Sequence, residues 1–221
     1  KLKEYAISEE WAHIRSLHGF IAESGLGWDV FICSNLIHTY ATSGMLYDAL
    51  YVFDSMIFRD TIVWNSMMKA YADHGYGKRT LAMFTQMQQE GLEPTKGTIV
   101  ILLKGCGSIE SLDECRKLHL FVIWSGFSSE MHVESCLVDL YGKCNDMTIA
   151  FGMFESMNER DVVVWNSMIV TYCEQGMYKQ SIAIYEDMKQ EGICPNDLSV
   201  LGMLKVCTKG LFLKQGKYVH S

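Results

Sequence analysis

The stretch VVVWNSMIVTYCEQG at residues 162–176 is a near-copy of TIVWNSMMKAYADHG at residues 61–75. The two copies lie 101 residues apart, and residues 61–95 match residues 162–196 at 14 of 35 positions. A sequence that repeats at a fixed period is built from a repeated structural unit, so this period decides the fold. The identical positions include Trp64 with Trp165, Asn65 with Asn166, Gly91 with Gly192 and Pro94 with Pro195.

The period of 101 residues divides into units of 31, 35 and 35 residues, which we call short, standard and long. The chain begins and ends inside a long unit. We therefore expect it to be a single repeat array and a fragment of a longer protein. The divisions are a partial long unit at 1–29, a short unit at 30–60, a standard unit at 61–95, a long unit at 96–130, a second short unit at 131–161, a second standard unit at 162–196 and a partial long unit at 197–221.

Each unit has the pattern of two helices. In the first standard unit, apolar side chains recur every four residues over 61–75 and every three residues over 78–90, and we expect Ala82 to be a small packing position. A glycine-centred turn at 74–77 separates the helices, and Gly91 ends the second one. One helix pair cannot bury its own apolar face, whereas stacked pairs can. The sequence thus predicts an all-α fold, an α-solenoid of stacked helix-turn-helix repeats.

Composition narrows the possible functions. The 221 residues are 49% hydrophobic and 20% charged, which is enough for a core and too apolar for disorder. No apolar run reaches the roughly 18 residues of a membrane span, and a net charge of −7 disfavours nucleic-acid binding through phosphates alone. No two of the eight cysteines have CxxC spacing, so we expect no metal site and no cofactor. Reduced packing thiols are expected instead, as at the repeat equivalents Cys106 and Cys207.

Several motifs recur with these unit lengths: VWNSM at 63–67 and 164–168, VFDSM at 52–56, LIHTYATSG at 36–44, LLKGC at 102–106, LVDLYGKC at 137–144 and MFESMNERD at 153–161. Together they resemble the pentatricopeptide repeat (PPR) family of land plants, in the PLS subclass that alternates long, short and standard motifs. Tetratricopeptide repeats have a constant 34 residues and a W-x2-L-G-x2-Y pattern, whereas Trp64 is followed by Asn-Ser-Met. The resemblance covers essentially the whole chain and implies a right-handed superhelix.

The resemblance implies binding of single-stranded RNA, one nucleotide per repeat, by the fifth and the last residue of each unit. A short polar side chain on the first helix can hydrogen-bond the edge of an unstacked base. A polar side chain at the end of the unit can support that contact. The implied base-recognition pairs are Ser34 with Asp60, Asn65 with Thr95, Val100 with Glu130, Ser135 with Asp161, and Asn166 with Asn196.

The family's pairing rules convert these pairs into an expected RNA sequence. Ser with Asp implies guanine, Asn in the fifth place implies a pyrimidine, and Asn in both places favours cytosine. Val100 cannot hydrogen-bond a base, so its unit is expected to read weakly or act as a spacer. The expected register, 5′ to 3′, is G–pyrimidine–any–G–pyrimidine. The second residue of each unit is expected to wedge between bases: Phe31, Ile62 and Val163 suit that role, whereas Gly97 and His132 depart from it.

Each candidate also has a purely structural interpretation. The two fifth-place asparagines are of a residue type that caps helix starts. Asp60 and Asp161 are expected to cap the helix of the next unit, a role compatible with base reading. Trp64 and Trp165 indicate core packing rather than stacking platforms. Three histidines recur at one place in the long units and indicate a packing or surface role: His18, His119 and His220.

We expect no enzyme activity in this chain. His132-Val133-Glu134 matches the first half of the H-x-E…P-C-x-x-C signature of zinc deaminases, but the second half is absent from the sequence. Members of the PLS subclass often carry such a domain beyond their repeats. The resemblance therefore implies an RNA-binding module that positions a plastid or mitochondrial transcript for processing, with C-to-U editing as the favoured process.

A protein–protein scaffold, the usual role of tetratricopeptide solenoids, is the alternative function. The net charge favours the scaffold. The polar residues kept at the fifth and last places favour RNA binding more, because scaffolding does not require that register. Editing proteins of this subclass also recruit protein partners, so the two functions are compatible. Neither a membrane nor a small-molecule substrate is expected as a partner.

Overall fold

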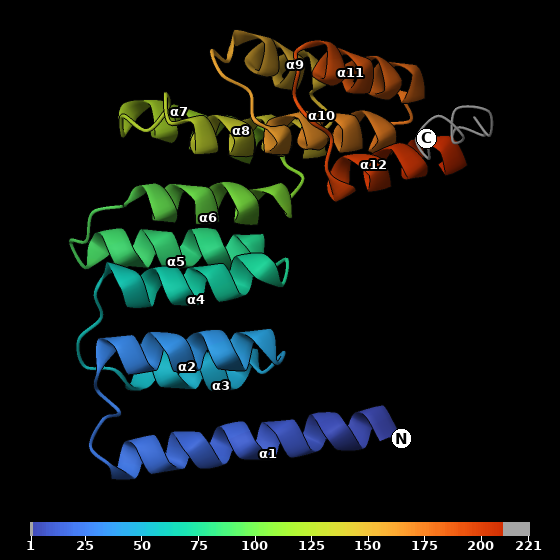
Figure 1. Cartoon of the computed structure of the whole chain (residues 1–221). Helices are drawn as coiled ribbons and strands as arrows, with labels where there is room; N and C mark the ends of the chain where they lie inside the picture. Colours follow the sequence, from blue (N-terminus) through green and yellow to red (C-terminus); the bar gives the residue numbers. More distant parts are fainter. Residues whose placement is uncertain (1, 210–221) are drawn as a thin grey trace. The chain divides into compact units, whose positions relative to one another are not determined.

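A computed structural model describes residues 2–209 of the chain, with side chains from residue 11 onward, and these residues form twelve α-helices and no strand (Figure 1). The chain divides into two compact units, residues 1–109 and 110–221, which we call unit 1 and unit 2. The boundary falls within the predicted long unit at 96–130. The helices of unit 1 are α1 (Leu2–Glu23), α2 (Val30–Thr42), α3 (Leu46–Ser55), α4 (Thr61–Asp73), α5 (Gly77–Gln89) and α6 (Lys96–Gly107). Those of unit 2 are α7 (Leu112–Trp124), α8 (Met131–Lys143), α9 (Met147–Ser156), α10 (Val162–Glu174), α11 (Tyr178–Gln190) and α12 (Asp197–Lys209).

The predicted repeats are helix pairs, and the all-α solenoid architecture is confirmed. In unit 1, α2 packs on its own partner α3 and on α4, and α4 packs on α5 and α6. In unit 2, α8 packs on α9 and α10, and α10 packs on α11 and α12. First helices thus pack on first helices, with the second helices behind them, so that each pair buries the apolar face that its neighbour leaves open.

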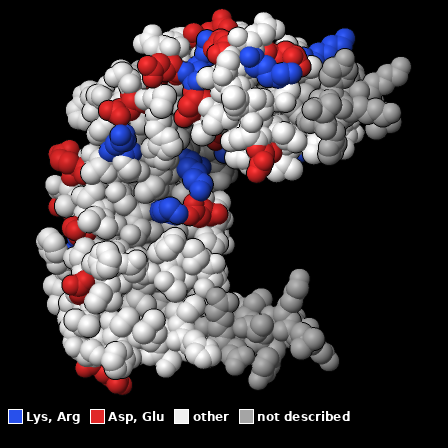
Figure 2. Space-filling model, in the orientation of Figure 1, with Lys and Arg blue, Asp and Glu red and all other residues white. Residues whose placement is uncertain are grey.

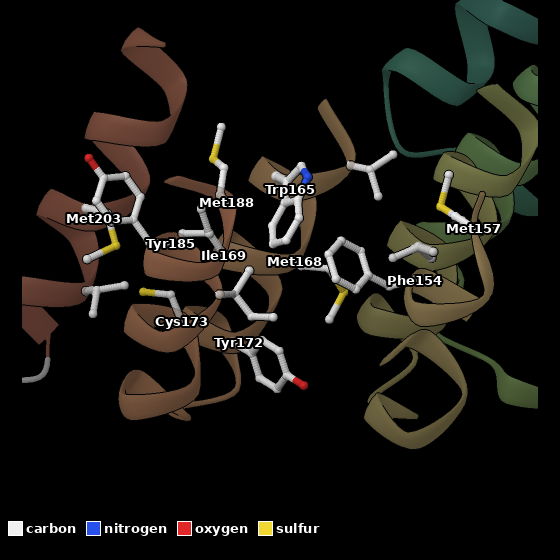
Figure 3. Packing of buried hydrophobic residues seen from close by; sticks show 14 residues of the cluster. Phe154, Met157, Trp165, Met168, Ile169, Tyr172, Cys173, Tyr185, Met188 and Met203 are labelled. Atoms are coloured by element: carbon white, nitrogen blue, oxygen red, sulfur yellow. The ribbon is translucent and has the colours of Figure 1, made fainter. Parts of the chain in front are cut away.

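One aromatic joint recurs at the junction between a short and a standard repeat. In unit 2, the Trp165 ring meets the Phe154 ring edge-on at 4.8 Å, and both lie in a cluster with Met157 and Met168 (Figure 3). The Arg160 guanidinium lies 5.0 Å from the Phe154 ring centre and 5.3 Å from that of Trp165. The tryptophan is 1% exposed, so the predicted packing role is confirmed.

Unit 1 contains the same joint. Phe53 and Trp64 meet edge-on at 4.8 Å, and the Arg59 guanidinium lies over both rings. Both arginines also pair with a carboxylate at the end of the standard repeat, at 3.4 Å for Arg59 with Glu90 and 2.8 Å for Arg160 with Glu191. The Arg-Asp motif that ends the short repeat therefore covers the joint with a cation.

Small residues set the spacing between helices. A Cβ on Gly105 of α6 would meet the side chain of Thr80 on α5, and a Cβ on Gly142 of α8 would meet Thr171 on α10. The expectation that Ala82 is the small packing position was wrong, because Ala82 is exposed while Thr80 is fully buried. The helix face is rotated relative to the sequence estimate because three-residue spacing drifts from the true helical period. Cys106 and Cys207 are buried, as predicted.

The first helix differs from its repeat equivalent. Residues 7–10 correspond to the turn at 108–111, yet α1 runs through them without a break. The turn in the second copy contains Glu110 at φ 54°, preceded by Gly107 and Ser108, whereas the first copy has Ala6, Ile7 and two glutamates. These residues favour a continuing helix.

Turns that follow helices use left-handed backbone, usually at glycine. Gly176, after α10, has φ 72° and open space around it, whereas Gly152, inside α9, has no left-handed strain and equally open space. The two glycines therefore differ only in the backbone conformation that each must adopt.

We predict opposite effects of the same substitution at these two glycines. Gly176→Ala should lower the free energy of unfolding by about 1 kcal/mol, because an L-residue disfavours left-handed backbone. Gly152→Ala should raise it by about 0.5–1 kcal/mol through helix propensity. Urea midpoints at equal slope measure both changes, and two changes of the same sign would contradict this explanation.

The repeated histidine is part of the packing. The Nδ1 atom of His119 lies 2.9 Å from the hydroxyl oxygen of Tyr141, and the same contact joins His18 to Tyr40 at 2.9 Å. The predicted packing role is confirmed for these two positions, and His220 lies outside the described residues. Burial lowers the pKa of His119, because the half-buried site disfavours the imidazolium.

This pKa shift predicts a loss of stability in mild acid. Since the folded-state pKa lies below the ordinary value of about 6.5, the unfolded chain binds more protons, and the stabilising contribution falls as the pH drops below about 6.5. His119→Gln should flatten the stability–pH curve between about pH 7 and 5. His132→Gln, at an exposed position of unit 2, is the matched control for removal of one histidine. Equal slopes for the wild-type chain and His119→Gln would contradict the prediction.

Candidate nucleic-acid interface

Grooves lie between successive first helices in both units. In unit 1, a groove of about 450 Å³ lies between α2 and α4, and its wall includes Phe31, Ser34 and Ile62. In unit 2, a groove of about 560 Å³ lies between α10 and α12. We call them the α2/α4 groove and the α10/α12 groove. Residues that line the α10/α12 groove include Val163, Asn166, Asn196, Leu198 and Lys205.

The structure brings together the fifth and last residues of both standard repeats. Asn166 Nδ2 donates to Asn196 Oδ1 at 3.0 Å, and Asn65 Nδ2 donates to Thr95 Oγ1 over a long 3.5 Å. Neither fifth-place asparagine is a helix cap, because each lies inside its helix, five residues after the capping aspartate. Asn166 lines the α10/α12 groove, whereas Asn65 is not among the residues that line the α2/α4 groove.

The last residue of most repeats caps the following helix. Asp60 Oδ1 accepts from Ile62 N and Val63 N, and Asp161 Oδ1 accepts from Val163 N and Val164 N. Among the described residues, Oδ2 of these two carboxylates takes no hydrogen bond. The capping role is thus confirmed, and it uses one oxygen of each carboxylate. Thr95 and Asn196 also accept from backbone N–H groups of the next helix, whereas Glu130, before α8, makes no side-chain cap.

In the second standard repeat, the third residue of the following repeat hydrogen-bonds the fifth-place amide. Ser199 Oγ, fully buried, donates to Asn166 Oδ1 at 2.6 Å and lies 3.2 Å from Asn196 Oδ1. Its repeat equivalent Thr98 bonds Thr95 instead, and Asn65 Oδ1 is buried without a partner among the described residues. The sequence analysis missed this residue. The one sign of it in the sequence is that residues with a hydroxyl group, Thr98 and Ser199, occupy equivalent positions 101 residues apart.

The short repeats are arranged differently. Ser34 Oγ donates to Phe31 O, and Ser135 Oγ donates to Met131 O, so both hydroxyl protons stay within their own helices. Ser34 is 8% exposed and Ser135 is 6% exposed. In the described residues, no hydrogen bond joins either serine to its predicted aspartate. In the long repeat, Val100 is half-buried on α6 of unit 1, and Glu130 is exposed before α8 of unit 2.

Second-place residues stand at the mouths of the grooves. Phe31 and Ile62 flank the α2/α4 groove and are 75% and 59% exposed. Val163, 52% exposed, flanks the α10/α12 groove together with Leu198, 62% exposed. Leu198 was missed because its repeat is incomplete in sequence, although it is the second residue of the unit that begins at 197. Gly97 and His132, which depart from the wedge pattern, are also exposed.

Charges near the grooves are mixed in sign. Figure 2 shows Lys and Arg side chains in small groups beside Asp and Glu, with uncharged surface between them, on the face in view. In unit 1, Asp73 pairs with Lys69 and with Lys104. Burial opposes ionisation of Asp73, but the hydrogen bonds and charge of these two lysines outweigh burial and lower its pKa. The α10/α12 groove contains Asp139 and the exposed Lys205.

The described part of the chain contains neither a cluster of metal-binding side chains nor a membrane-spanning helix. Among these residues, His, Cys, Asp and Glu side chains do not gather in threes as a metal ion would require. Within the same range, each helix is too short or too polar to span a membrane. The candidate interface consists of polar side chains, apolar flanking residues and scattered charges.

Comparison with known proteins agrees with this geometry. A chloroplastic pentatricopeptide repeat-containing protein of Arabidopsis thaliana, At1g11290, is 34% identical over 206 residues, covering 93% of this chain and 26% of that protein. A mitochondrial one, At2g03880, is 32% identical over 205 residues, covering 93% and 32%. The chain thus spans about a quarter to a third of the length of these curated relatives. The crystal structure of PPR10 in complex with an 18-nt psaJ RNA element superposes with a TM-score of 0.74 at 17% identity, covering 94% of this chain and 31% of that one.

Family models match most of the chain. The PPR repeat family model matches residues 59–108 and 160–209, and the PPR repeat model matches residues 31–60 and 135–162. The ranges begin close to the predicted repeats and include the joints and grooves described above. This chain belongs to the pentatricopeptide repeat family.

Proposed function

We propose that the chain binds single-stranded RNA and reads it one base per repeat along the layer of first helices. The observation that carries the proposal is the α10/α12 groove, where two apolar second-place residues flank a fixed amide pair. In this proposal, a base lies between Val163 and Leu198, and Asn166 and Asn196 contact its edge; the shared lining of the groove and the amide hydrogen bond support it. The α2/α4 groove shares only the apolar flanking residues, Phe31 and Ile62, and its Ser34 hydroxyl donates within its own helix.

The chemistry suits unstacked bases. An asparagine amide both donates and accepts, so it can match the mixed donor and acceptor edge of a pyrimidine. A carboxylate only accepts, so the open oxygen of Asp60 or Asp161 fits the N–H groups of guanine. The proposed register remains G–pyrimidine–any–G–pyrimidine, with cytosine favoured at the last place and Val100 with Glu130 reading weakly. PPR10, of the same fold, was crystallised on RNA, which supports this choice of ligand.

The proposed biological setting is an organelle. Relatives labelled chloroplastic and mitochondrial support a plastid or a mitochondrion. The alternation of repeat lengths supports the PLS subclass, in which the array would position a transcript for C-to-U editing with protein partners, and any deaminase would belong to another part of the protein. In this proposal, the repeats bind the transcript and do not catalyse the deamination.

A scaffold for protein partners is the second candidate function. The net charge of −7 and the mixed surface charges favour it, because they offer little attraction to phosphates. The two functions make different predictions for short RNAs.

Base preference should depend on the fifth-place asparagines. The 221-residue chain, titrated with RNA carrying G–pyrimidine–any–G–C, should lose about tenfold or more in affinity when purines replace the second and fifth bases, since one good base contact is worth about 1–3 kcal/mol. Asn65→Ala with Asn166→Ala should abolish that discrimination. Asn158→Ala, an exposed loop asparagine outside both grooves, is the matched control and should keep it.

The controls separate the two candidate functions. Circular dichroism establishes that the variants are folded. Equal weak binding to every RNA, unchanged by the double variant, would reject base reading and leave the scaffold.

The two roles of Asp161 should be separable by substitution. Asp161→Asn keeps an acceptor for the helix cap, so its stability should stay within a few tenths of a kcal/mol, whereas Asp161→Ala should lose about 1 kcal/mol. Both should weaken the preference for guanine over adenine at the fourth base, because both remove the carboxylate. Urea unfolding and RNA titration measure the two effects. Retained guanine preference in Asp161→Asn would show that this residue caps the helix without reading the base.

A further inference from the structure

Two cysteines meet where α7 packs on α8. The Sγ atoms of Cys115 and Cys144 lie 2.8 Å apart, while a disulfide bond is about 2.05 Å long. Cys115 is inside α7, and Cys144 is the residue that follows the last turn of α8. Both belong to unit 2, so the contact lies within one compact unit. Less than 1 Å of sulfur movement separates this contact from a covalent bond.

The pair is not part of the repeated pattern. At the 101-residue offset, the equivalents of Cys115 and Cys144 are Ile14 and Ser43. In contrast, Cys106 recurs as Cys207, and both are buried in helices as packing residues. The equivalent positions in the first copy of the repeat, Ile14 and Ser43, have no thiol. The packing of α7 on α8 therefore does not require two cysteines. Packing alone does not explain why both positions are cysteine.

The two thiols differ in access in the way that a disulfide-forming pair requires. Cys115 is fully buried, whereas Cys144 is partly exposed at the end of α8. The turn after Cys144 contains Asn145 in the left-handed region, at φ 60°. A soluble oxidant therefore reaches Cys144 first, and Cys115 is already in place behind it.

We propose that Cys115 and Cys144 are a thiol modification site that forms an intramolecular disulfide on exposure to a small-molecule disulfide such as oxidised glutathione. The Cys144 thiolate attacks the oxidant, forms a mixed disulfide and releases one thiolate. The Cys115 thiolate then attacks Cys144 Sγ, forms the Cys115–Cys144 bond and releases the second thiolate. The protein loses two protons and two electrons, and the oxidant becomes two thiols.

The disulfide would tie the second helix of the long repeat to the first helix of the next short repeat. The closed loop includes residues 115–144, and so includes Ser135. A covalent link across such a loop restricts the unfolded chain and resists separation of α7 from α8. Oxidation would therefore fix the α7/α8 interface while leaving the α10/α12 groove unlinked.

An internal control exists in the same chain. Cys194 is exposed and has no sulfur contact among the described residues. It can form the mixed disulfide but has no second thiol to resolve it. Oxidised glutathione should thus leave an adduct on Cys194 and a disulfide at the pair, two products of different mass.

The test is oxidation of the 221-residue chain with oxidised glutathione, followed by alkylation, digestion and mass spectrometry without reduction. We expect one linked peptide containing Cys115 and Cys144, two hydrogens lighter than its parts and separated by dithiothreitol. Cys136→Ser, which removes a neighbouring α8 thiol, should retain that peptide. Cys115→Ser should instead retain glutathione on Cys144, because the resolving thiol is gone.

Two results would overturn the proposal. One is complete alkylation of both cysteines after an oxidation that modifies Cys194. The other is linkage of Cys144 to a different cysteine in the wild-type chain. The wild-type peptide map decides between these results without depending on the folding of any variant.

Discussion

The edge-on contact between a phenylalanine and the tryptophan of the next repeat is the constraint on which the structure depends. Phe154 with Trp165, and Phe53 with Trp64, each join the second helix of a short repeat to the first helix of a standard repeat. Truncating a buried ring of this size typically costs about 3–5 kcal/mol. The contact also fixes where α4 and α10 begin relative to the preceding helix. The capping aspartate and the fifth-place asparagine lie about one turn or less from that tryptophan, so the joint sets the position of the candidate interface.

Helix capping explains why structural and recognition roles share residues at this interface. The end of each repeat must supply an acceptor for the free N–H groups of the next helix, and Asp, Asn and Thr do so. Asn196 also lines the α10/α12 groove, because the start of α12 forms part of the wall of that groove. A residue that already caps a helix can therefore also contact a ligand without a further change in sequence. In Asp161, one carboxylate oxygen is available for each of these two roles.

The sequence predicted the features that follow from period and local propensity. Helix pairs, the caps at Asp60 and Asp161, and the burial of Trp64 and Trp165 all depend on neighbours a few residues away or on the repeat itself. The features it missed depend on contacts between helices. Ser199 reaches Asn166 across a repeat boundary, and Thr80 replaced Ala82 as the buried position.

Contacts that occur in only one copy of the repeat could not be predicted from the sequence either. The approach of Cys115 to Cys144 depends on how α7 packs on α8, and neither position has a cysteine at the 101-residue offset. The division of the chain after Ile109 likewise reflects packing rather than composition. Residues 30 positions apart carry no local signal of contact in the sequence. The pairing of Asn166 with Asn196 was therefore expected from the family resemblance alone.

The hydrogen bond from Ser199 to Asn166 has a consequence for modularity. Its donor belongs to the repeat after the one whose base Asn166 is proposed to read, so the recognition module is offset from the sequence repeat by at least three residues. A recombination or design step that exchanges residues 162–196 as a cassette would move the amide without its supporting hydroxyl. A cassette running from 162 to 199 would keep both. Interchangeable parts of such an array should be cut inside the first turn of a helix rather than between repeats.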